Sequence, residues 1–395
     1  MGANDLQGSY ESLRGVVSRT LQMARYSQAP SDRSPHFPPL IHVEPTNACN
    51  LRCVHCHHHV GNNPSLVRPF GIMKMDVFAK VVEEAAALNC AVTLNVQGEP
   101  TLHPRFVDMV AALKDKGIFV SIITNGTRMT EELARALLGL GLDRVVFSFD
   151  AIDKDIYEAV RVRSKFEPTL ANILRFLRLN EEHGHRTHVC MSMVLQDRTR
   201  GQADDYRRYF ERLPVDKIFL NEVLNLSGAS GVSDEIDVPA LKRQAGGRQP
   251  VCRIPWEDLT VNWDGEVCPC PVDVNLVYSV GNVRDTSLLE LWNSERMRTF
   301  RNAHLTGDFS AIEGNGPLCS GCNSRWSPEY DLRHYPDYAV DAICRAAAHH
   351  APGLVAPRQG AADVHYQNLL ECIANIEGTT AGNRPPGGHA VDGAH

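Results

Sequence analysis

The sequence predicts an α/β protein with a parallel sheet, open or curled into a partial (β/α) barrel of six strand–helix units, followed by a smaller C-terminal domain. From about residue 38 to 223, short apolar runs alternate with longer segments of helical periodicity. A Gly- and Ser-rich stretch follows at 226–250. Beyond it, two short strands joined by an Asp-Gly turn are expected within 256–270, a pattern typical of a β-hairpin.

The strands of the six units are predicted from apolar runs such as "AVTLNV" and "RVVFSFD". They are expected at 40–45, 91–96, 118–124, 144–150, 187–195 and 216–223. Apolar residues that recur every three or four positions predict the intervening helices at 75–89, 105–117, 130–141, 168–183 and 203–213. Ligands bind at the C-terminal ends of the strands in such sheets, so functional residues are expected there.

The segments outside the barrel give the expected domain organisation. The domain after the linker is expected to contain a helix at 287–303, which a serine caps at its start. The predicted parts are an N-terminal helical extension (1–38), the partial barrel (39–225), a linker (226–250), a hairpin-and-helix domain (251–335), a helical segment (336–376) and a Gly/Pro-rich disordered tail (377–395).

The composition excludes several functional classes. The chain has 395 residues, of which 43% are hydrophobic, so it can bury a core. Its formal net charge is −7. The sequence contains no polycationic run that would predict nucleic-acid binding. It also contains no apolar span or signal peptide that would predict membrane insertion or secretion. A cytoplasmic protein is therefore expected. Seven of the twelve cysteines form two groups, which favours metal or redox chemistry over disulfides.

The first cysteine group lies directly after the first predicted strand. Cys49, Cys53 and Cys56 form a C-x3-C-x2-C pattern in "CNLRCVHCHHH". Three thiolates hold three irons of a 4Fe–4S cluster and leave the fourth iron open to a substrate or cofactor. A structural zinc site is the alternative, because His57, His58 or His59 could complete a Cys3His set. The spacing by itself fits both.

Further motifs appear in the order found in the radical S-adenosylmethionine (radical SAM) family, which this sequence resembles from residue 40 to about 225. "VQGEP" resembles the family's GGE motif, although Gln97 replaces its first glycine, and His55 stands where an aromatic residue is usual. "SIITNG" and "FSFDAIDKDIYEAVR" resemble its third and fourth strand ends. By this resemblance, the residues that bind SAM are Gly98, Glu99, Thr124, Asn125, Ser148, Asp150 and Arg161.

The resemblance implies a role for several of these residues. Glu99 would hold the methionyl amino group, Ser148 and Asp150 would approach the ribose, and Arg161 would bind the carboxylate. The three cysteines would bind the cluster on which SAM is reductively cleaved to a 5′-deoxyadenosyl radical. An external electron donor such as flavodoxin or ferredoxin is the expected protein partner.

The second cysteine group resembles an auxiliary-cluster domain, SPASM, in its shortened twitch form. Its predicted ligands are Cys252, Cys270, Cys319 and Cys322, with Gly265 between the first two in a C-x12-G-x4-C pattern. The resemblance implies one auxiliary 4Fe–4S cluster with four cysteine ligands. Cys268 could replace Cys270 as a ligand or lie free nearby.

By the same resemblance, an auxiliary cluster beside a radical site implies dehydrogenation of a small polar substrate, such as a sugar, amino sugar or aminocyclitol, in specialised or antibiotic metabolism. Asp273 and Glu222 are the candidate proton acceptors, and His57, His58, His59, Asn221 and Asn225 could bind the substrate. Three alternatives are an epimerase with Cys268 as hydrogen donor, a peptide-modifying enzyme and a non-catalytic zinc scaffold.

Overall fold

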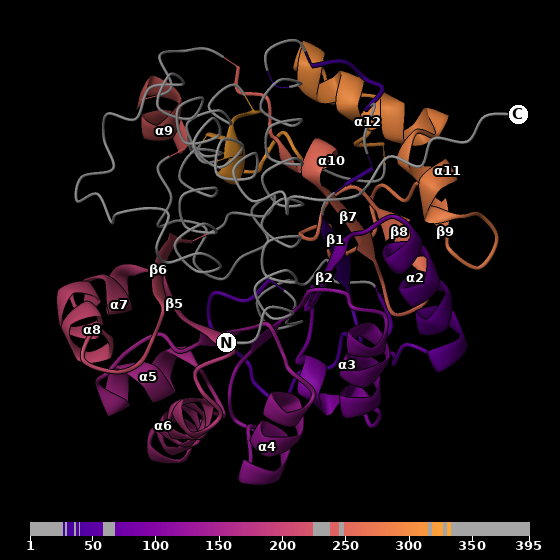
Figure 1. Ribbon diagram of the computed structural model, residues 1–395. Helices are drawn as coiled ribbons and strands as arrows, with labels where there is room; N and C mark the ends of the chain where they lie inside the picture. The colour runs from indigo at the N-terminus through magenta and orange to yellow at the C-terminus, as the bar shows by residue number, and fades with distance from the viewer. Residues whose placement is uncertain are drawn as a thin grey trace, which may run out of the picture. The chain divides into compact units, whose positions relative to one another are not determined.

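A nine-stranded sheet runs through the described part of the chain in the order β6-β5-β4-β3-β2-β1-β7-β8-β9 (Figure 1). The computed structural model describes Ser27 and residues 30–34, 37–38, 40–57, 68–223, 238–244, 249–314, 318–326 and 330–332. Ser31–Tyr330 form one compact unit, and Met1–Pro30 with Asp331–His395 form another that lies almost entirely outside the described residues.

The first six strands are parallel to one another and confirm the predicted fold class. They are β1 (Leu40–Val43), β2 (Ala91–Leu94), β3 (Val120–Thr124), β4 (Arg144–Ser148), β5 (His188–Leu195) and β6 (Lys217–Glu222). The helices between them are α2 (Met75–Ala87), α3 (Phe106–Asp115), α4 (Glu131–Gly139), α5 (Lys154–Val160), α6 (Phe166–Glu182), α7 (Asp197–Arg200) and α8 (Ala203–Phe210). A 3-10 turn, η1 (Pro100–Leu102), follows β2.

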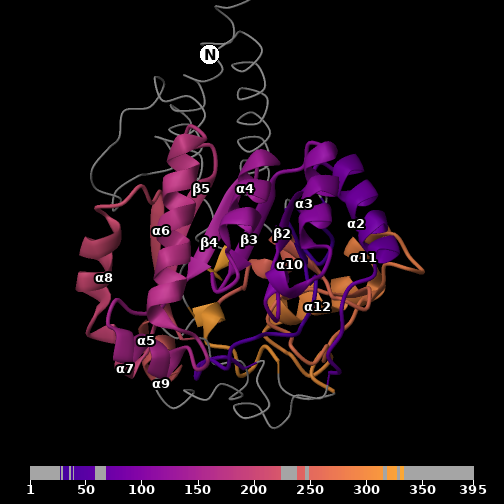
Figure 2. The same ribbon diagram turned by 90° about the horizontal axis from the view of Figure 1, so that it is seen from below.

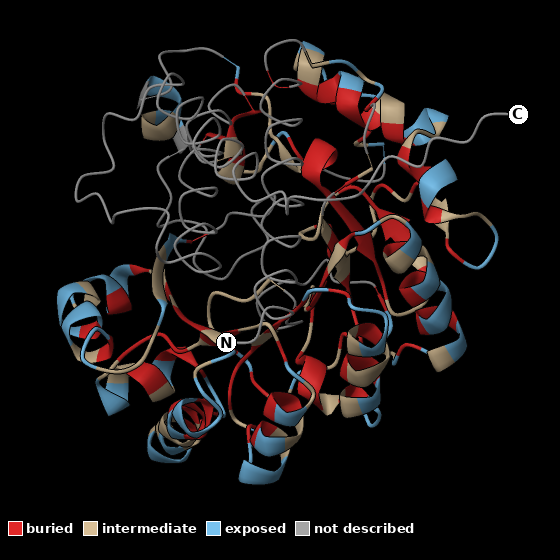
Figure 3. Cartoon of the chain, in the orientation of Figure 1, coloured by how far each residue is buried: buried red, intermediate tan, exposed pale blue. Residues whose placement is uncertain are grey.

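The helices cover one side of the curved sheet in the order of its strands. Seen from below, α8, α6, α4, α3 and α2 follow one another across it (Figure 2). Each turns a buried face to the strands and an exposed face outward (Figure 3). The strand residues beneath them are fully buried, including Ile41, Val43, Val92, Leu94, Val120, Ile122, Val145, Phe147, Val189 and Met191. This continuous apolar layer is typical of parallel strands that are covered by helices.

The C-terminal hairpin continues the barrel sheet, which the sequence did not predict. Strand β7 (Asp258–Val261) pairs in parallel with β1 and antiparallel with β8 (Glu266–Cys268), and β8 pairs with β9 (Gly281–Asn282). Gly265 has φ +87° in the predicted turn, and a Cβ there would lie 2.7 Å from Asn282 Oδ1. Glycine is therefore the residue that this turn accepts.

The predicted helix at 287–303 is wrong in one respect, because two helices fill the segment. They are α11 (Leu288–Trp292) and α12 (Glu295–Thr306). Ser294 interrupts the run because it adopts an extended conformation and its side chain accepts the Met297 N–H as an N-cap. Three short helical elements complete the described part: α9 (Val238–Gln244), inside the predicted linker, α10 (Ile254–Glu257) and η3 (Ser324–Trp326).

The segments predicted at 1–38, 336–376 and 377–395 lie wholly or largely outside the described residues. Their predicted structure stays a prediction. Within the described part of the chain, no helix combines the length and the apolar character needed to cross a membrane.

Replacing Phe147 by Ala is expected to lower the free energy of unfolding by about 3–5 kcal/mol, because the ring is fully buried against Phe176 of α6. The matched control is Phe119→Ala, since Phe119 directly precedes the neighbouring strand β3 and is 43% exposed. Urea denaturation measures both. Equal losses in the two variants would contradict the described core.

Candidate active site

The first cysteine group lies on a loop that two backbone hydrogen bonds hold against the segment after α5. The N–H of Arg52 donates to Val162 O at 2.9 Å, and that of Val54 donates to Val160 O at 3.0 Å. The N–H of Cys56 then donates to Cys53 O at 3.1 Å, which tightens the turn between these two cysteines. The loop is thus shaped by its backbone, and Cys49, Cys53 and Cys56 are displayed from it.

The thiols of this loop hold their protons more tightly than a free thiol does. Burial raises the pKa of Cys49 to about 11 and also raises the pKa of Cys53, so both stay protonated until a metal displaces the protons. Among the described residues, no three His, Cys, Asp or Glu side chains gather closely enough to hold one metal ion. Two of the candidate zinc ligands, His58 and His59, lie outside the described residues.

Gly98 fixes the backbone between β2 and the predicted SAM-binding glutamate. Its φ is +75°, and a Cβ there would lie 2.5 Å from Thr46 O and 2.6 Å from Ala48 O. The next residue, Glu99, donates its N–H to Ala48 O at 2.8 Å. The loop after β2 therefore packs directly on the chain that leads to Cys49, and only glycine permits this approach.

Glu99 is a buried carboxylate at the centre of a network that joins the loop after β2 to the end of β3. Its Oε1 accepts the Thr101 N–H and hydroxyl and the Thr124 hydroxyl, the last at 2.8 Å. Its Oε2 accepts the Asn125 N–H at 2.7 Å. Burial raises the pKa of Glu99, and these donors oppose the rise. Because Oε2 accepts a single hydrogen bond, it retains capacity for a further donor such as an ammonium group.

Asp150 and Arg161 form a buried ion pair beside Cys53. Arg161 Nε donates to Asp150 Oδ2 at 2.6 Å, and Asp150 Oδ1 accepts the Val194 N–H at 2.9 Å. Burial would lower the pKa of Arg161, but Asp150 and Cys53 outweigh it and raise that pKa. Asp150 thus orients the guanidinium. The predicted ribose contacts of Asp150 and of Ser148, at the end of β4, stay predictions.

His55 fills the place between this ion pair and β5. Its Nε2 lies 3.8 Å from Asp150 Oδ2, and its Nδ1 lies 3.2 Å from Gln196 Nε2. Burial lowers the pKa of His55 to about 4, so the imidazole is neutral at pH 7. The imidazole therefore packs as a neutral polar group where the family usually has an aromatic ring.

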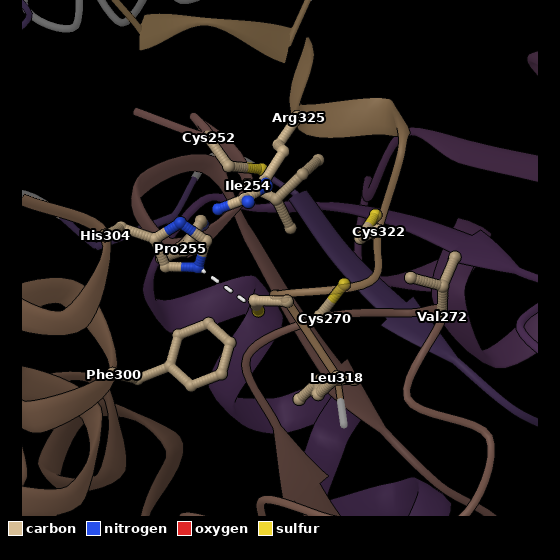
Figure 4. A pocket seen from close by; sticks show the side chains of 11 residues that line it. Cys252, Ile254, Pro255, Cys270, Val272, Phe300, His304, Leu318, Cys322 and Arg325 are labelled. Atoms are coloured by element: carbon tan, nitrogen blue, oxygen red, sulfur yellow. Dashed lines mark hydrogen bonds between the residues drawn. The ribbon is translucent and has the colours of Figure 1, made fainter. Parts of the chain in front are cut away.

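The second cysteine group lines one cavity. Cys252, Cys270, Cys319 and Cys322 line about 350 Å³ of space that is partly open to solvent, and Figure 4 shows the side chains of Cys252, Cys270 and Cys322 around it. Burial raises the pKa of Cys252 to about 12 and places those of Cys270 and Cys319 well above the usual value. Four thiols around one apolar cavity fit a fully ligated 4Fe–4S cluster.

Cys268 is not among the residues that line this cavity. Its thiol donates to Cys270 O at 3.3 Å and accepts from Asn262 Nδ2 at 3.5 Å. Only 1% of Cys268 is exposed. The geometry thus favours Cys270 as the ligand, as predicted, and makes Cys268 a buried neighbour.

The two predicted proton acceptors have partners that occupy their carboxylates. Asp273 is buried, and its oxygens accept the N–H groups of Val277 at 2.8 Å and Tyr278 at 2.9 Å. Glu222 is exposed on β6 and pairs with Arg200 through two contacts of 2.9 and 2.7 Å. Both therefore have a structural function already, and their catalytic role stays a prediction. Asn221 is exposed nearby and donates to Ser192 Oγ, whereas Asn225 lies outside the described residues.

Gln97 joins the two predicted cofactor sites. Its Nε2 donates to the carbonyl of Pro271 at 3.1 Å, and Pro271 directly follows Cys270. The replacement of the family's first glycine thus gives the chain a side chain that reaches the auxiliary-site loop. Sequence reasoning noted the replacement but did not predict this contact.

Two further residues of the auxiliary cavity were not predicted. His304 from α12 and Arg325 from η3 both line it (Figure 4). His304 Nε2 lies 3.4 Å from Cys319 Sγ. The only sequence signal was the position of Arg325 three residues after Cys322.

Comparisons with known proteins agree with this geometry. The radical SAM superfamily model matches residues 43–208, and the model of an iron–sulfur cluster-binding domain, SPASM, matches residues 252–323. The tungsten-containing aldehyde ferredoxin oxidoreductase cofactor-modifying protein of Pyrococcus furiosus is 28% identical over 324 residues, which are 72% of this chain and 87% of the relative.

Two other proteins are similar over comparable spans. The cysteine-type anaerobic sulfatase-maturating enzyme of Clostridium novyi is 25% identical over 346 residues, covering 73% of this chain and 88% of the relative. The crystal structure of BtrN in complex with AdoMet and 2-DOIA has a TM-score of 0.51 at 18% identity and covers 75% of this chain and 98% of BtrN. At that identity the likeness concerns the fold.

Gly98→Ala is expected to abolish SAM binding and to destabilise the protein by more than about 1 kcal/mol, because the added Cβ meets backbone oxygens. Gly117→Ala is the matched control: Gly117 has φ +70°, but a Cβ there meets nothing within 4 Å. Isothermal titration with SAM and urea denaturation measure the two effects. Retained SAM binding in the Gly98 variant would contradict the proposal that this close backbone approach positions the SAM-binding residues.

Cys270→Ala is expected to reduce the iron content of the anaerobically reconstituted protein from about eight to about four atoms per chain, because it removes a ligand of the auxiliary cluster. Cys268→Ala is the control and is expected to keep about eight. Iron and sulfide analysis decides. The ligand assignment is wrong if the Cys268 variant loses iron and the Cys270 variant does not.

Proposed function

Since the chain is a radical SAM enzyme with a SPASM-type auxiliary-cluster domain, we propose that it dehydrogenates a small polar substrate such as a sugar, amino sugar or aminocyclitol. The observation that carries this proposal is the four-cysteine cavity, whose loop at Pro271 contacts the predicted SAM-binding segment through Gln97. On this proposal, a site for an electron acceptor would lie beside the site for radical formation, an arrangement that suits a net two-electron oxidation.

The three cysteines of the first loop would hold the cluster that binds SAM, and the four of the cavity would hold the auxiliary cluster. When bound, SAM and the first cluster supply a radical that removes a hydrogen atom, and the auxiliary cluster supplies a one-electron acceptor. A CH–OH group that loses a hydrogen atom, a proton and an electron becomes a carbonyl.

The protein's own side chains would bind and orient SAM. Glu99 Oε2 would accept the methionyl ammonium, since it has hydrogen-bonding capacity left. Arg161, which Asp150 holds through its Nε, would present its other guanidinium N–H groups to the carboxylate. Asp273 and Glu222 are the candidate proton acceptors from this chain, and either must release a present partner to act.

Two of the similar proteins support a small-molecule substrate. The relative from Pyrococcus furiosus carries the name of a cofactor-modifying protein, and BtrN was crystallised with AdoMet and the compound 2-DOIA. We include in the proposal a cytoplasmic location and an external electron donor such as flavodoxin or ferredoxin.

Modification of a protein or peptide is a second candidate, because the relative from Clostridium novyi is named a sulfatase-maturating enzyme. Epimerisation is less favoured. It would require Cys268 to return a hydrogen atom to the substrate. This thiol is buried and donates a hydrogen bond to the Cys270 carbonyl.

The reconstituted protein is expected to release 5′-deoxyadenosine from SAM under strong reductant and to convert its substrate to a carbonyl. Cys319→Ala is expected to keep SAM cleavage but lose the oxidised product, whereas Cys53→Ala is expected to lose both. Chromatography with mass spectrometry measures nucleoside and product, with substrates drawn from metabolites that accumulate when the gene is deleted.

Normal product formation by the Cys319 variant would refute dehydrogenation through the auxiliary cluster. A product of unchanged oxidation state that carries solvent deuterium would indicate epimerisation instead, and turnover on a peptide alone would indicate the second candidate.

A further inference from the structure

Arg325 is a buried cation at the auxiliary cavity. The four proposed cysteine ligands would complete a cluster without it, so its presence there needs another reason. The residue is 6% exposed, and its side chain points into the cavity (Figure 4). Its Nε and Nη1 have no hydrogen-bond partner among the described residues. Burying polar N–H groups without partners is costly, so a partner other than the described residues is expected.

Aromatic rings hold this guanidinium in place. Its carbon lies 4.8 Å from the centre of the Phe309 ring and 4.9 Å from that of Trp326. Such stacking orients the guanidinium while leaving its N–H groups unused. No carboxylate of the described residues lies within ion-pair distance of Arg325, although Glu313 is close enough to influence it. The positive charge therefore faces the thiols without an ion-pair partner among the described residues.

His304 is a second buried side chain whose contacts indicate a bound group in the same cavity. Its Nε2 lies 3.4 Å from Cys319 Sγ, and its Nδ1 is buried without a hydrogen-bond partner among the described residues. The rings of Phe300 and Phe309, each 5.2 Å away, fix the imidazole. A thiolate bound to iron carries no proton, so the hydrogen of this contact must then be on Nε2 and be donated to sulfur.

We propose that Arg325 and His304 raise the reduction potential of the auxiliary cluster and so make it an electron acceptor. Reduction adds a negative charge to the cluster and its thiolates. A nearby cation and N–H donors to sulfur stabilise the reduced state more than the oxidised state. Both are positioning residues that act through the cluster, and the inference rests on the proposed assignment of the four cysteines as its ligands.

The test uses the full-length chain with Cys49, Cys53 and Cys56 each replaced by Ala, so that only the auxiliary cluster remains. Iron analysis must first give about four atoms per chain. Potentiometric titration, followed by the electron paramagnetic resonance signal of the reduced cluster, then gives its potential. At a fixed potential, Arg325→Met is expected to lower the ratio of reduced to oxidised cluster about tenfold, equivalent to about 59 mV for a one-electron couple.

His304→Leu is expected to lower the same ratio by a smaller factor, about threefold, because it removes one neutral donor. The matched control is Lys242→Met. Lys242 is an exposed cation that lies 5.6 Å from the same Trp326 ring, so its removal changes the net charge equally but in solvent. The control is expected to leave the ratio unchanged.

Each outcome decides the inference. Arg325 and His304 variants that titrate like the control would overturn it while the iron count upholds the ligand assignment. Absence of iron in the triple-alanine protein would overturn both. If Arg325→Met fails to retain iron, Arg325→Lys and Arg325→Gln replace it: Lys is expected to keep the potential and Gln to lower it. Equal potentials for these two variants would contradict the role of the charge.

Discussion

The parallel pairing of β1 with β7 is the constraint on which both cysteine groups depend. The register runs from Leu40 opposite Asp258 to Val43 opposite Val261, and the N–H of Glu44 continues it by donating to Val261 O at 2.9 Å. Parallel strands end at the same edge of a sheet, so the loop after β1, with Cys49, and the turn after β7 leave from one edge. Main-chain hydrogen bonds, and not a linker, thus relate the barrel to the cluster domain.

A buried ion pair secures this junction. Arg68 Nη2 donates to Glu44 Oε2 at 2.9 Å, and the same oxygen accepts the Trp263 N–H at 3.1 Å. Trp263 begins the turn between β7 and β8, so Glu44 ties the end of β1 to the hairpin. Removing one member would leave a buried charge without its partner, which is costly. Together with the hydrogen bond that Gln97 donates to the Pro271 carbonyl, this ion pair adds side-chain contacts to the backbone hydrogen bonds at the junction.

The sequence was informative wherever short-range pattern determines structure. The six strands and their helices were predictable because apolar periodicity follows directly from which face is buried. Glu99 was singled out by a motif, and in the structure it contacts Thr124 and Asn125, two other predicted SAM-binding residues. The β1–β7 pairing was not predictable, since the residues that pair are more than 200 positions apart and strand pattern does not specify a partner.

The partners of the site residues were harder to predict for the same reason. Asp150 was assigned to the ribose by resemblance, but its contact with Arg161 depends on how α5 returns to the sheet. His304 and Cys319 meet only because α12 and the following loop fold back on each other. Cys268 and Cys270 are two residues apart in one chain segment, and their different surroundings emerge only from the packing around them.

The two cysteine groups differ in how their neighbouring arginine is compensated. Arg161 lies beside Cys53 but is paired with the buried Asp150, so this pair contributes little net positive charge to the first site. Arg325 lies beside Cys319 and Cys322 and forms no such pair within the described ranges. Arg325 and His304 would thereby make the auxiliary cluster easier to reduce. An acceptor that is easier to reduce favours electron transfer from a substrate radical, which dehydrogenation needs and epimerisation does not.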